Sequence, residues 1–382
     1  MTERVAVLGS TGSVGRSALD VIDKARGRFS IDGLAAGSNW RVLLEQARKY
    51  RPSVVALGNE SHADPLREGL SDLAIRLCVG PDAVTELVGL SSADTVVCAI
   101  SGIAALAGML AAAKRGLKLA VASKEAFVAA GRIVMQTAAE HGAQIIPIDS
   151  EHCAIHQALA GRNGEEVRRV ILTASGGPFL NMPVDGLRSV SPTQALDHPT
   201  WQMGPKTTVD SGTMMNKALE IVEAQWLFGL APEAIDVVVH PEAVVHSMVE
   251  FIDGTLLAQM STPDMRLPIV YALYHPERSD IPLAPLDLTR MRPMTFQKAD
   301  PAGFPALGLG FEVARRRGTL GAVMNAANEE AVSGFLGGRI TFDRISSLVA
   351  DVMSRHTVLD NPDLGQILEA DRWARQEAIG WM

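Results

Sequence analysis

The chain has 382 residues, a formal net charge of −8 and an apolar content of 47%. This length is too great for one ordinary hydrophobic core and predicts two or three domains, and the composition is globular rather than disordered. The acidic balance argues against a surface that binds nucleic acid or a membrane over a wide area, although a local basic pocket for a phosphate is compatible with it.

Three widely spaced cysteines, Cys78, Cys98 and Cys153, match neither a disulfide framework nor a zinc-ligand pattern. An odd number of widely spaced cysteines fits a protein from a reducing compartment. No charged leader precedes a long apolar stretch at the N-terminus, and the most apolar segment, residues 103–113, is too short to cross a bilayer. We therefore expect a cytoplasmic protein.

The first 150 residues alternate short apolar strands with helical patterns. Strands are predicted at residues 5–8, 29–36, 54–57, 95–100, 118–122 and 143–148, and helices at 14–25 and 40–50. Such alternation predicts a parallel sheet with helices on both faces. We therefore expect an α/β fold that begins with a Rossmann-like domain over residues 1–149.

The rest of the chain changes character. Strands are predicted at residues 168–174, 235–240, 245–252 and 255–260, a long loop at 175–206, a helix at 214–228, and four further helices at 307–317, 322–335, 342–355 and 364–379. The segment between the two groups is Pro-rich and lacks periodicity. We therefore predict a central α+β catalytic domain over residues 150–280, a linker over 281–304 and a C-terminal helical bundle over 305–382.

A glycine-rich segment, Gly9-Ser10-Thr11-Gly12-Ser13-Val14-Gly15, joins the first predicted strand to the first predicted helix. Glycines let the backbone approach an anion closely, and the helix start offers N–H groups and a favourable dipole to a pyrophosphate. The GxxGxxG spacing alone also occurs in ordinary tight turns. Its position at the opening of a βαβ unit is what favours dinucleotide binding.

The end of the second predicted strand bears on which dinucleotide is bound. NAD enzymes commonly carry an acidic side chain here that holds the ribose hydroxyls. This chain has Gly37, Ser38 and Asn39, followed by Arg41, and no carboxylate. Small polar donors and a cation favour the extra phosphate of NADP, although Asn39 also suits the cap of the next helix.

A pair of carboxylates, Asp149 and Glu151, follows the predicted strand at residues 143–148. Alternate residues at a strand end point the same way, so the two are expected to converge at the sheet edge where α/β proteins bind ligands. Two oxygen ligands suit Mg²⁺ or Mn²⁺. A solvated loop with a helix cap is the plainer alternative.

A second polar group lies on the predicted helix at residues 214–228. Asn216, Glu220 and Glu223 share one helical face, and Lys217 lies beside them. This face suits a third metal ligand and a phosphate clamp, since side-chain donors and the nearby helix start favour an anion. A solvent-exposed helix face is the alternative.

The segment at residues 197–206 contains Trp201 and Met203 among polar residues. Large apolar side chains in such a loop predict a flexible lid that closes over a substrate, whereas a loop packed on its own domain is the alternative. Cys153 adjoins His152, but adjacent residues seldom have the geometry of a Cys–His nucleophile, and a small thiol at a helix start usually contributes to packing.

Nine segments in order along the chain resemble the 1-deoxy-D-xylulose 5-phosphate reductoisomerase family, and the similarity covers essentially the whole sequence. Besides the glycine-rich segment they are Ser123-Lys124-Glu125, Asp149-Ser150-Glu151-His152, Ala174-Ser175-Gly176-Gly177-Pro178, His198-Pro199-Thr200-Trp201, Met215-Asn216-Lys217-Ala218-Leu219-Glu220, His240-Pro241, Pro263-Asp264-Met265 and Asn325-Ala326-Ala327-Asn328-Glu329.

The resemblance implies a role for each matching residue. The metal, Mg²⁺ or Mn²⁺, would be held by Asp149, Glu151 and Glu220. The substrate would be held by Lys124, Ser150, Glu151, Ser175, His198, Trp201, Ser211, Asn216, Lys217 and Glu220, with catalytic roles for Lys124, Glu151 and His198. NADPH would be held by Thr11, Gly12, Ser13, Val14, Gly37, Ser38, Asn39, Ser123, Glu125 and Gly204.

The reaction implied by the resemblance is the NADPH- and metal-dependent rearrangement and reduction of a sugar phosphate, 1-deoxy-D-xylulose 5-phosphate, to 2-C-methyl-D-erythritol 4-phosphate in non-mevalonate isoprenoid biosynthesis. The family also implies a homodimer. Two departures from the family pattern are Ser123 in place of the usual Asn, and Glu242-Ala243 in place of Gln-Ser.

Two other functions fit part of the sequence. An NADP dehydrogenase that leaves the carbon skeleton intact would need the nucleotide loop but no site with three carboxylates. A non-catalytic NADP-binding regulatory protein would need neither a lid nor a phosphate clamp.

Overall fold

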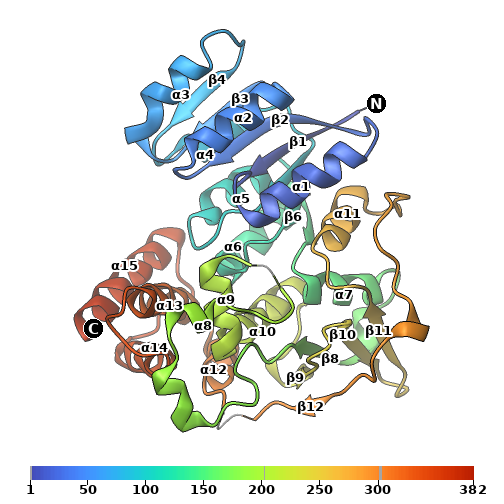
Figure 1. Cartoon of the computed structure of the whole chain (residues 1–382), viewed down its shortest axis with the longest axis vertical. Helices are drawn as coiled ribbons and strands as arrows, with labels where there is room; N and C mark the ends of the chain where they lie inside the picture. The colour runs from blue at the N-terminus through green and yellow to red at the C-terminus, as the bar shows by residue number, and fades with distance from the viewer. Residues whose placement is uncertain (1, 202, 301–302) are drawn as a thin grey trace. The chain divides into compact units, whose positions relative to one another are not determined.

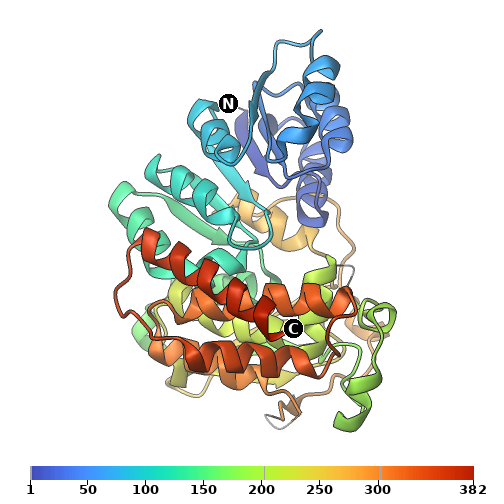
Figure 2. The same ribbon diagram turned by 90° about the vertical axis from the view of Figure 1, so that its left-hand side faces the viewer.

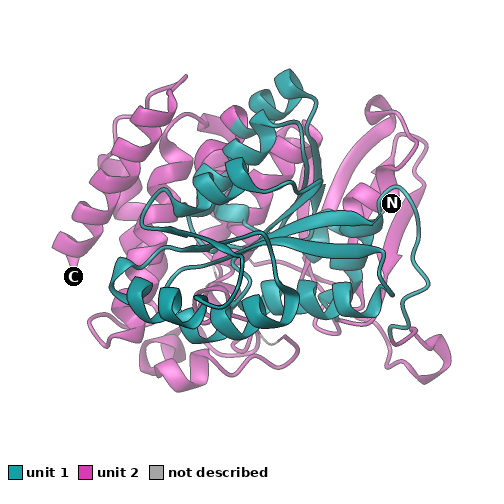
Figure 3. Ribbon diagram, turned by 90° about the horizontal axis from the view of Figure 1, so that it is seen from above, with its two compact units in different colours: residues 1–126, 134–153, 264–283 teal, residues 127–133, 154–263, 284–382 magenta. Residues whose placement is uncertain are grey.

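The computed structural model describes residues 2–201, 203–300 and 303–382, and the chain divides into two compact units (Figure 1). The first unit comprises residues 1–126, 134–153 and 264–283, drawn in teal in Figure 3. The second comprises residues 127–133, 154–263 and 284–382, drawn in magenta. Among the described residues no helix is long and apolar enough to span a membrane.

Seven parallel strands form the sheet of the first unit, in the order β4-β3-β2-β1-β5-β6-β7. They are β1 (Glu3–Leu8), β2 (Phe29–Ala36), β3 (Val54–Leu57), β4 (Arg76–Val79), β5 (Thr95–Cys98), β6 (Lys118–Val121) and β7 (Gln144–Pro147). Apolar runs such as residues 5–8 are buried because helices cover both faces of the sheet. The predicted parallel sheet is confirmed, with the edge strand β4 in addition.

Helices pack against the sheet of the first unit. They are α1 (Ser13–Lys24), α2 (Trp40–Tyr50), α3 (Ala63–Gly69), α4 (Ala83–Leu90), α5 (Ala105–Lys114) and α11 (Arg266–Tyr274), while α6 (Lys124–His141) and α7 (Ser150–Leu159) have residues in both units. Apolar residues of α1, α2, α3 and α11 form one continuous core with the strands, whereas α4 packs against α5.

Five strands form the sheet of the second unit, in the order β11-β10-β8-β9-β12. They are β8 (Val167–Ala174), β9 (Ile235–Val239), β10 (Val245–Phe251), β11 (Leu256–Met260) and β12 (Gln297–Lys298). β8 and β9 pair in parallel, and the other described pairs are antiparallel. The short strand β12 lies in the segment predicted as a linker, and it pairs with β9.

The helices of the second unit, which include the orange and red helices of Figure 2, share one hydrophobic core with this sheet. They are α8 (Pro192–Ala195), α9 (Pro205–Thr213), α10 (Met215–Phe228), α12 (Ala306–Arg316), α13 (Leu320–Leu336), α14 (Arg344–Arg355) and α15 (Leu364–Trp381). The long loop predicted at residues 175–206 is therefore interrupted by α8 and by a 3₁₀ turn at Val184–Ser189. The predicted fold class is confirmed, and the predicted domain boundaries stay a prediction.

Candidate active site

The turn after β1 has the backbone geometry of a phosphate-binding loop. Gly9 adopts φ +87°, and a Cβ there would lie 2.4 Å from the carbonyl oxygen of Ala99, so only glycine fits. Gly12 is the N-cap of α1 and supplies no side-chain acceptor to the first turn of the helix. The N–H groups of that turn are therefore suited to an anion. The predicted cofactor residues Thr11 to Val14 all lie here, and none of them is buried.

The end of β2 lies beside this turn, because β1 and β2 are adjacent parallel strands. Gly37, Ser38 and Asn39 follow β2 and are exposed. The side chain of Asn39 accepts a hydrogen bond from the N–H of Val42 at 3.3 Å, so it also caps α2. Arg41 places its guanidinium 4.7 Å from the ring centre of Trp40. The segment offers hydroxyl, amide and guanidinium donors and no carboxylate.

Ser123, the first departure from the family pattern, is 2% exposed and faces the protein. Its hydroxyl donates to the carbonyl oxygen of Ile100 at 2.5 Å, with the carbonyl oxygen of Cys98 at 3.1 Å. This serine therefore ties the start of α6 to the end of β5. Glu125, in the first turn of α6, is also buried.

Lys124 and Asp149 form a largely buried ion pair in the first unit. The ammonium of Lys124 lies 2.5 Å from Oδ2 of Asp149, and Nδ1 of His152 lies 3.5 Å from the same oxygen. Burial alone would raise the pKa of Asp149, but Lys124 and His152 outweigh it and hold the pKa of this carboxyl well below its ordinary value. Asp149 is thus held as a carboxylate, which is the form that binds a cation.

Asp149 and Glu151 do not lie on a strand, so the predicted reason for their convergence, the alternation of side chains along a strand, is wrong. β7 ends at Pro147 and α7 begins at Ser150, so strand alternation does not reach these residues. Asp149 lies in the strand-to-helix turn and Glu151 in the first helical turn. The hydroxyl of Ser150 donates to Oε2 of Glu151 at 2.5 Å. Both carboxylates still follow the carboxyl end of a parallel strand, where α/β proteins bind ligands.

Three predicted substrate residues converge in the second unit. Nε2 of His198 lies 3.2 Å from the hydroxyl of Ser175 and 3.1 Å from the hydroxyl of Ser211. The backbone N–H groups of Thr200 and Trp201 donate to Nδ1 of His198 at 3.0 and 2.9 Å. Because Nδ1 accepts two hydrogen bonds, the neutral ring carries its proton on Nε2. Burial lowers the pKa of His198, which favours that neutral ring.

The start of α10 carries a second buried ion pair. The ammonium of Lys217 donates to Oε2 of Glu220, and Nδ2 of Asn216 donates to Oε1 of the same carboxylate at 2.5 Å. Glu220 is 0% exposed and Lys217 is 3% exposed. A charged pair is seldom buried to this extent unless it is functional or fully hydrogen-bonded. The alternative of a solvent-exposed helix face is therefore wrong for these residues.

The predicted lid, residues 197–206, ends inside a helix, because α9 begins at Pro205. Gly204 is the N-cap of that helix, and residue 202 lies outside the described residues. The ring of Trp201 lies 6.1 Å, centre to centre, from that of His246 in β10.

Two groups near these residues escape prediction from the sequence. His246, whose Nε2 lies 2.8 Å from the hydroxyl of Ser261, has no neighbouring motif that would single it out. Asp210 directly precedes Ser211 and is 1% exposed. It accepts a hydrogen bond from Asn328 at 2.9 Å and lies 2.8 Å from the ammonium of Lys206. The one signal in the sequence that could have identified Asp210 is its position next to Ser211, a predicted substrate residue.

Three family models match successive parts of the chain. Residues 5–131 match 1-deoxy-D-xylulose 5-phosphate reductoisomerase, residues 145–228 match the C-terminal domain of that enzyme, and residues 260–377 match the DXP reductoisomerase C-terminal domain. A 1-deoxy-D-xylulose 5-phosphate reductoisomerase from Pelotomaculum thermopropionicum is 47% identical over 378 residues, which cover 99% of this chain and 98% of that protein. One from Prosthecochloris aestuarii is 46% identical over 98% of both chains.

Solved structures agree with these matches. The Zymomonas mobilis enzyme in complex with NADPH is 38% identical with a TM-score of 0.93, covering 100% of this chain and 99% of that one. A DOX-P reductoisomerase in complex with NADPH, fosmidomycin and magnesium is 36% identical with a TM-score of 0.92, covering 99% of this chain and 98% of that one. The chain therefore belongs to the 1-deoxy-D-xylulose 5-phosphate reductoisomerase family.

Proposed function

We propose that this chain converts 1-deoxy-D-xylulose 5-phosphate to 2-C-methyl-D-erythritol 4-phosphate, an oxidoreductase step of isoprenoid biosynthesis that needs NADPH and a divalent metal. Family membership over the full length supports this activity. The structural observation that carries it is the buried carboxylate Glu220, paired with Lys217 on the helix that follows Ser211. A simple nucleotide-binding protein has no need for such a group.

NADPH is assigned to the turn between β1 and α1 and to the segment after β2. The steric fit of Gly9 and the uncapped start of α1 suit a pyrophosphate, and the donors at residues 37–41 suit the 2′-phosphate. We assign to the cofactor Thr11, Gly12, Ser13, Val14, Gly37, Ser38, Asn39, Ser123, Glu125 and Gly204.

The metal is assigned to Asp149, Glu151 and Glu220, because three carboxylates form an oxygen donor set that suits Mg²⁺ or Mn²⁺. Asp149 is held as a carboxylate by Lys124, and each of the other two accepts a hydrogen bond that orients one of its oxygens. Magnesium is the ion named in complexes of related structures.

The substrate is assigned to side chains that donate hydrogen bonds. Ser175, Ser211, Asn216 and Lys217 would bind the phosphate. The single Nε2–H of His198 lies within reach of both serine hydroxyls, and this leaves the hydroxyl hydrogens available to donate to the phosphate. Lys124 and Ser150 would bind the reacting end. Trp201 and Met203 would cover it.

When bound, a divalent metal supplies Lewis-acid stabilisation of oxyanion charge and NADPH supplies the hydride. The ammonium of Lys124 neutralises negative charge that develops on the substrate oxygens. The phosphate ligands hold the remote end of the substrate, and this binding energy orients the reacting carbons. Trp201 and Met203 exclude water from the reacting atoms.

The activity is tested by following NADPH oxidation with 1-deoxy-D-xylulose 5-phosphate, with added Mg²⁺ or after exhaustive chelation. We expect turnover that requires both the substrate and the metal. Turnover that survives chelation would favour a dehydrogenase without rearrangement. No turnover with any sugar phosphate would favour a regulatory NADP-binding protein.

NADPH is expected to be used with a kcat/KM at least about 100-fold above that of NADH, because each charge-assisted hydrogen bond to the 2′-phosphate contributes roughly 1.5–3 kcal/mol. Ser38→Asp should lower this preference by placing a negative charge beside that phosphate. Ser71→Asp, which adds the same charge at an exposed turn after α3, is the matched control and should leave the preference unchanged. Equal kcat/KM values for the two cofactors in the unaltered protein would contradict the assignment.

The lid is tested by amide hydrogen exchange. Fosmidomycin with Mg²⁺ should slow exchange at residues 197–201 and 203–206, since the N–H groups of Thr200 and Trp201 already donate to His198, a proposed substrate ligand. Exchange in α14 serves as the internal reference and should not change. Equal exchange rates with and without saturating ligand would argue for a fixed loop.

We further propose that the chain forms a homodimer and acts in the cytoplasm. The first proposal rests on the family, and the second on three cysteines that are free and buried.

A further inference from the structure

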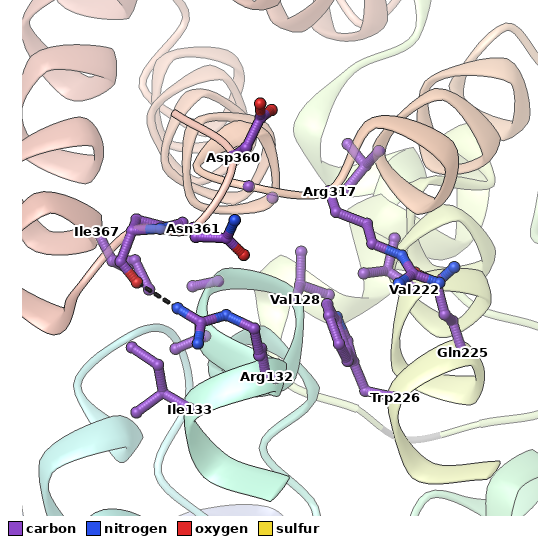
Figure 4. Close-up of a pocket in the computed structure, with 17 residues that line it drawn as sticks. Val128, Arg132, Ile133, Val222, Gln225, Trp226, Arg317, Asp360, Asn361 and Ile367 are labelled. Atoms are coloured by element: carbon purple, nitrogen blue, oxygen red, sulfur yellow. Dashed lines mark hydrogen bonds between the residues drawn. The ribbon is translucent and has the colours of Figure 1, made fainter. Parts of the chain in front are cut away.

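A cavity of about 130 Å³ lies entirely within the second unit (Figure 4). It is lined by residues 128–133 of α6, by Val222, Gln225 and Trp226 of α10, by residues at the end of α12 and the start of α13, and by residues 360–362. None of these residues has a role in the proposed reaction.

One wall of the cavity is an indole ring packed directly on a helix backbone. A Cβ on Gly131 would lie 2.3 Å from Cδ1 of Trp226, so this glycine permits the ring to lie against α6. The guanidinium carbon of Arg317 lies 5.5 Å from the centre of the same ring. Val222, Val313 and other aliphatic side chains extend the apolar surface.

Two guanidinium groups, of Arg132 and Arg317, and one carboxylate, of the exposed Asp360, line the cavity. Neither guanidinium has a carboxylate partner within ion-pair distance in the part of the chain that the structure describes. Arg132 donates to the carbonyl oxygen of Pro362 at 2.6 Å, and the guanidinium of Arg317 lies over the ring of Trp226. Arg317 also adopts φ +55° and ψ −138°, a backbone conformation that glycine adopts far more readily. Backbone preference alone would therefore favour glycine at this position, which instead carries a cation.

We propose that this cavity binds a small organic anion, in which a carboxylate or phosphate is joined to an apolar, preferably ring-shaped, body. Guanidinium groups pair with either anion through two parallel hydrogen bonds, and a mostly apolar concave surface with few polar groups is typical of small-molecule sites. Val222, Gln225 and Trp226 follow Glu220 by less than two turns of α10, so an occupant would also contact the helix that carries the proposed metal and phosphate ligands.

The proposal is tested with phenylphosphate and phenylacetate as anionic probes, 2-phenylethanol as the neutral analogue and inorganic phosphate as the anion without an apolar body. Binding is followed by calorimetry and by the fluorescence of Trp226. We expect at least one of the two anionic probes to bind saturably, and 2-phenylethanol and inorganic phosphate to bind at least about tenfold more weakly, because each lacks one of the two recognised parts. Binding of only one anionic probe identifies which anion the cavity prefers.

Arg317→Gln should weaken binding of the anionic probe at least about tenfold, since it removes one of the two charged donors. Arg315→Gln, an equal change of charge in the last turn of α12 and outside the cavity, is the matched control. Trp226→Phe should abolish the fluorescence change while calorimetry still detects binding. Ser211→Ala, in the proposed phosphate site, should leave the fluorescence change intact. No saturable binding of either anionic probe, or equal affinity in Arg317→Gln and the unaltered protein, would overturn the proposal.

Discussion

Lys124→Met should lower kcat by about 10²–10³-fold, the usual effect of removing one group that stabilises transition-state charge. The ammonium is buried and lies 2.5 Å from Asp149. Its removal deprives the substrate oxygens of a neighbouring cation. Without Lys124, burial is the strongest influence on the pKa of Asp149, and this pKa should rise. A carboxyl group that is protonated more readily is a weaker ligand for a metal.

Lys118→Met is the matched control for this variant. Lys118 is a half-buried lysine of the first unit that pairs with Glu3 at 2.9 Å, and it lies at the opposite end of β6 from Lys124. We expect its kcat to stay within about twofold of the unaltered protein, because a lost ion pair away from the chemistry affects stability more than catalysis. A kcat for Lys124→Met within tenfold of the unaltered value would remove Lys124 from the catalytic role.

Glu220→Gln should lower turnover by about 10²-fold or more at a fixed metal concentration, because an amide oxygen is a weaker ligand than a carboxylate for a hard cation. Raising the metal concentration should recover part of the loss. NADPH affinity should be unchanged, since the turn between β1 and α1 does not involve this residue. The free energy of unfolding should also fall, because Lys217 is 3% exposed and loses its charged partner.

Stability and catalysis are separated by measuring thermal unfolding and NADPH binding in the same preparation. Glu312→Gln, at a solvent-accessible ion pair on α12, is the control for a simple change of charge. Near-normal turnover of Glu220→Gln at the same metal concentration would show that the carboxylate is structural rather than a metal ligand.

Strongly periodic segments of this chain could be predicted well from the sequence. The helix at residues 40–50 has the predicted bounds, and α10 differs from its prediction by one residue, because each has a clear beginning and end. α6 is not predicted at all. It is buried on most sides in its first half and kinked at Ala130, so it shows no amphipathic period.

The site residues show where sequence patterns stop being informative. The spacing of Asn216 and Glu220 predicts a shared helix face, but whether this face is buried depends on tertiary packing that the spacing does not encode. Strand alternation predicts that Asp149 and Glu151 converge, and this reasoning fails because a helix begins at Ser150. The tautomer of His198 is set by two backbone N–H groups, and these have no sequence signature.

The central claim is that the chain rearranges a carbon skeleton as well as reducing it. The most direct test is to incubate the protein with 1-deoxy-D-xylulose 5-phosphate labelled with ¹³C, NADPH and Mg²⁺, and to identify the product by NMR. We predict the branched product 2-C-methyl-D-erythritol 4-phosphate, formed in equal amount to the NADPH consumed and absent after chelation. A linear polyol phosphate, or product formation independent of metal, would contradict the account.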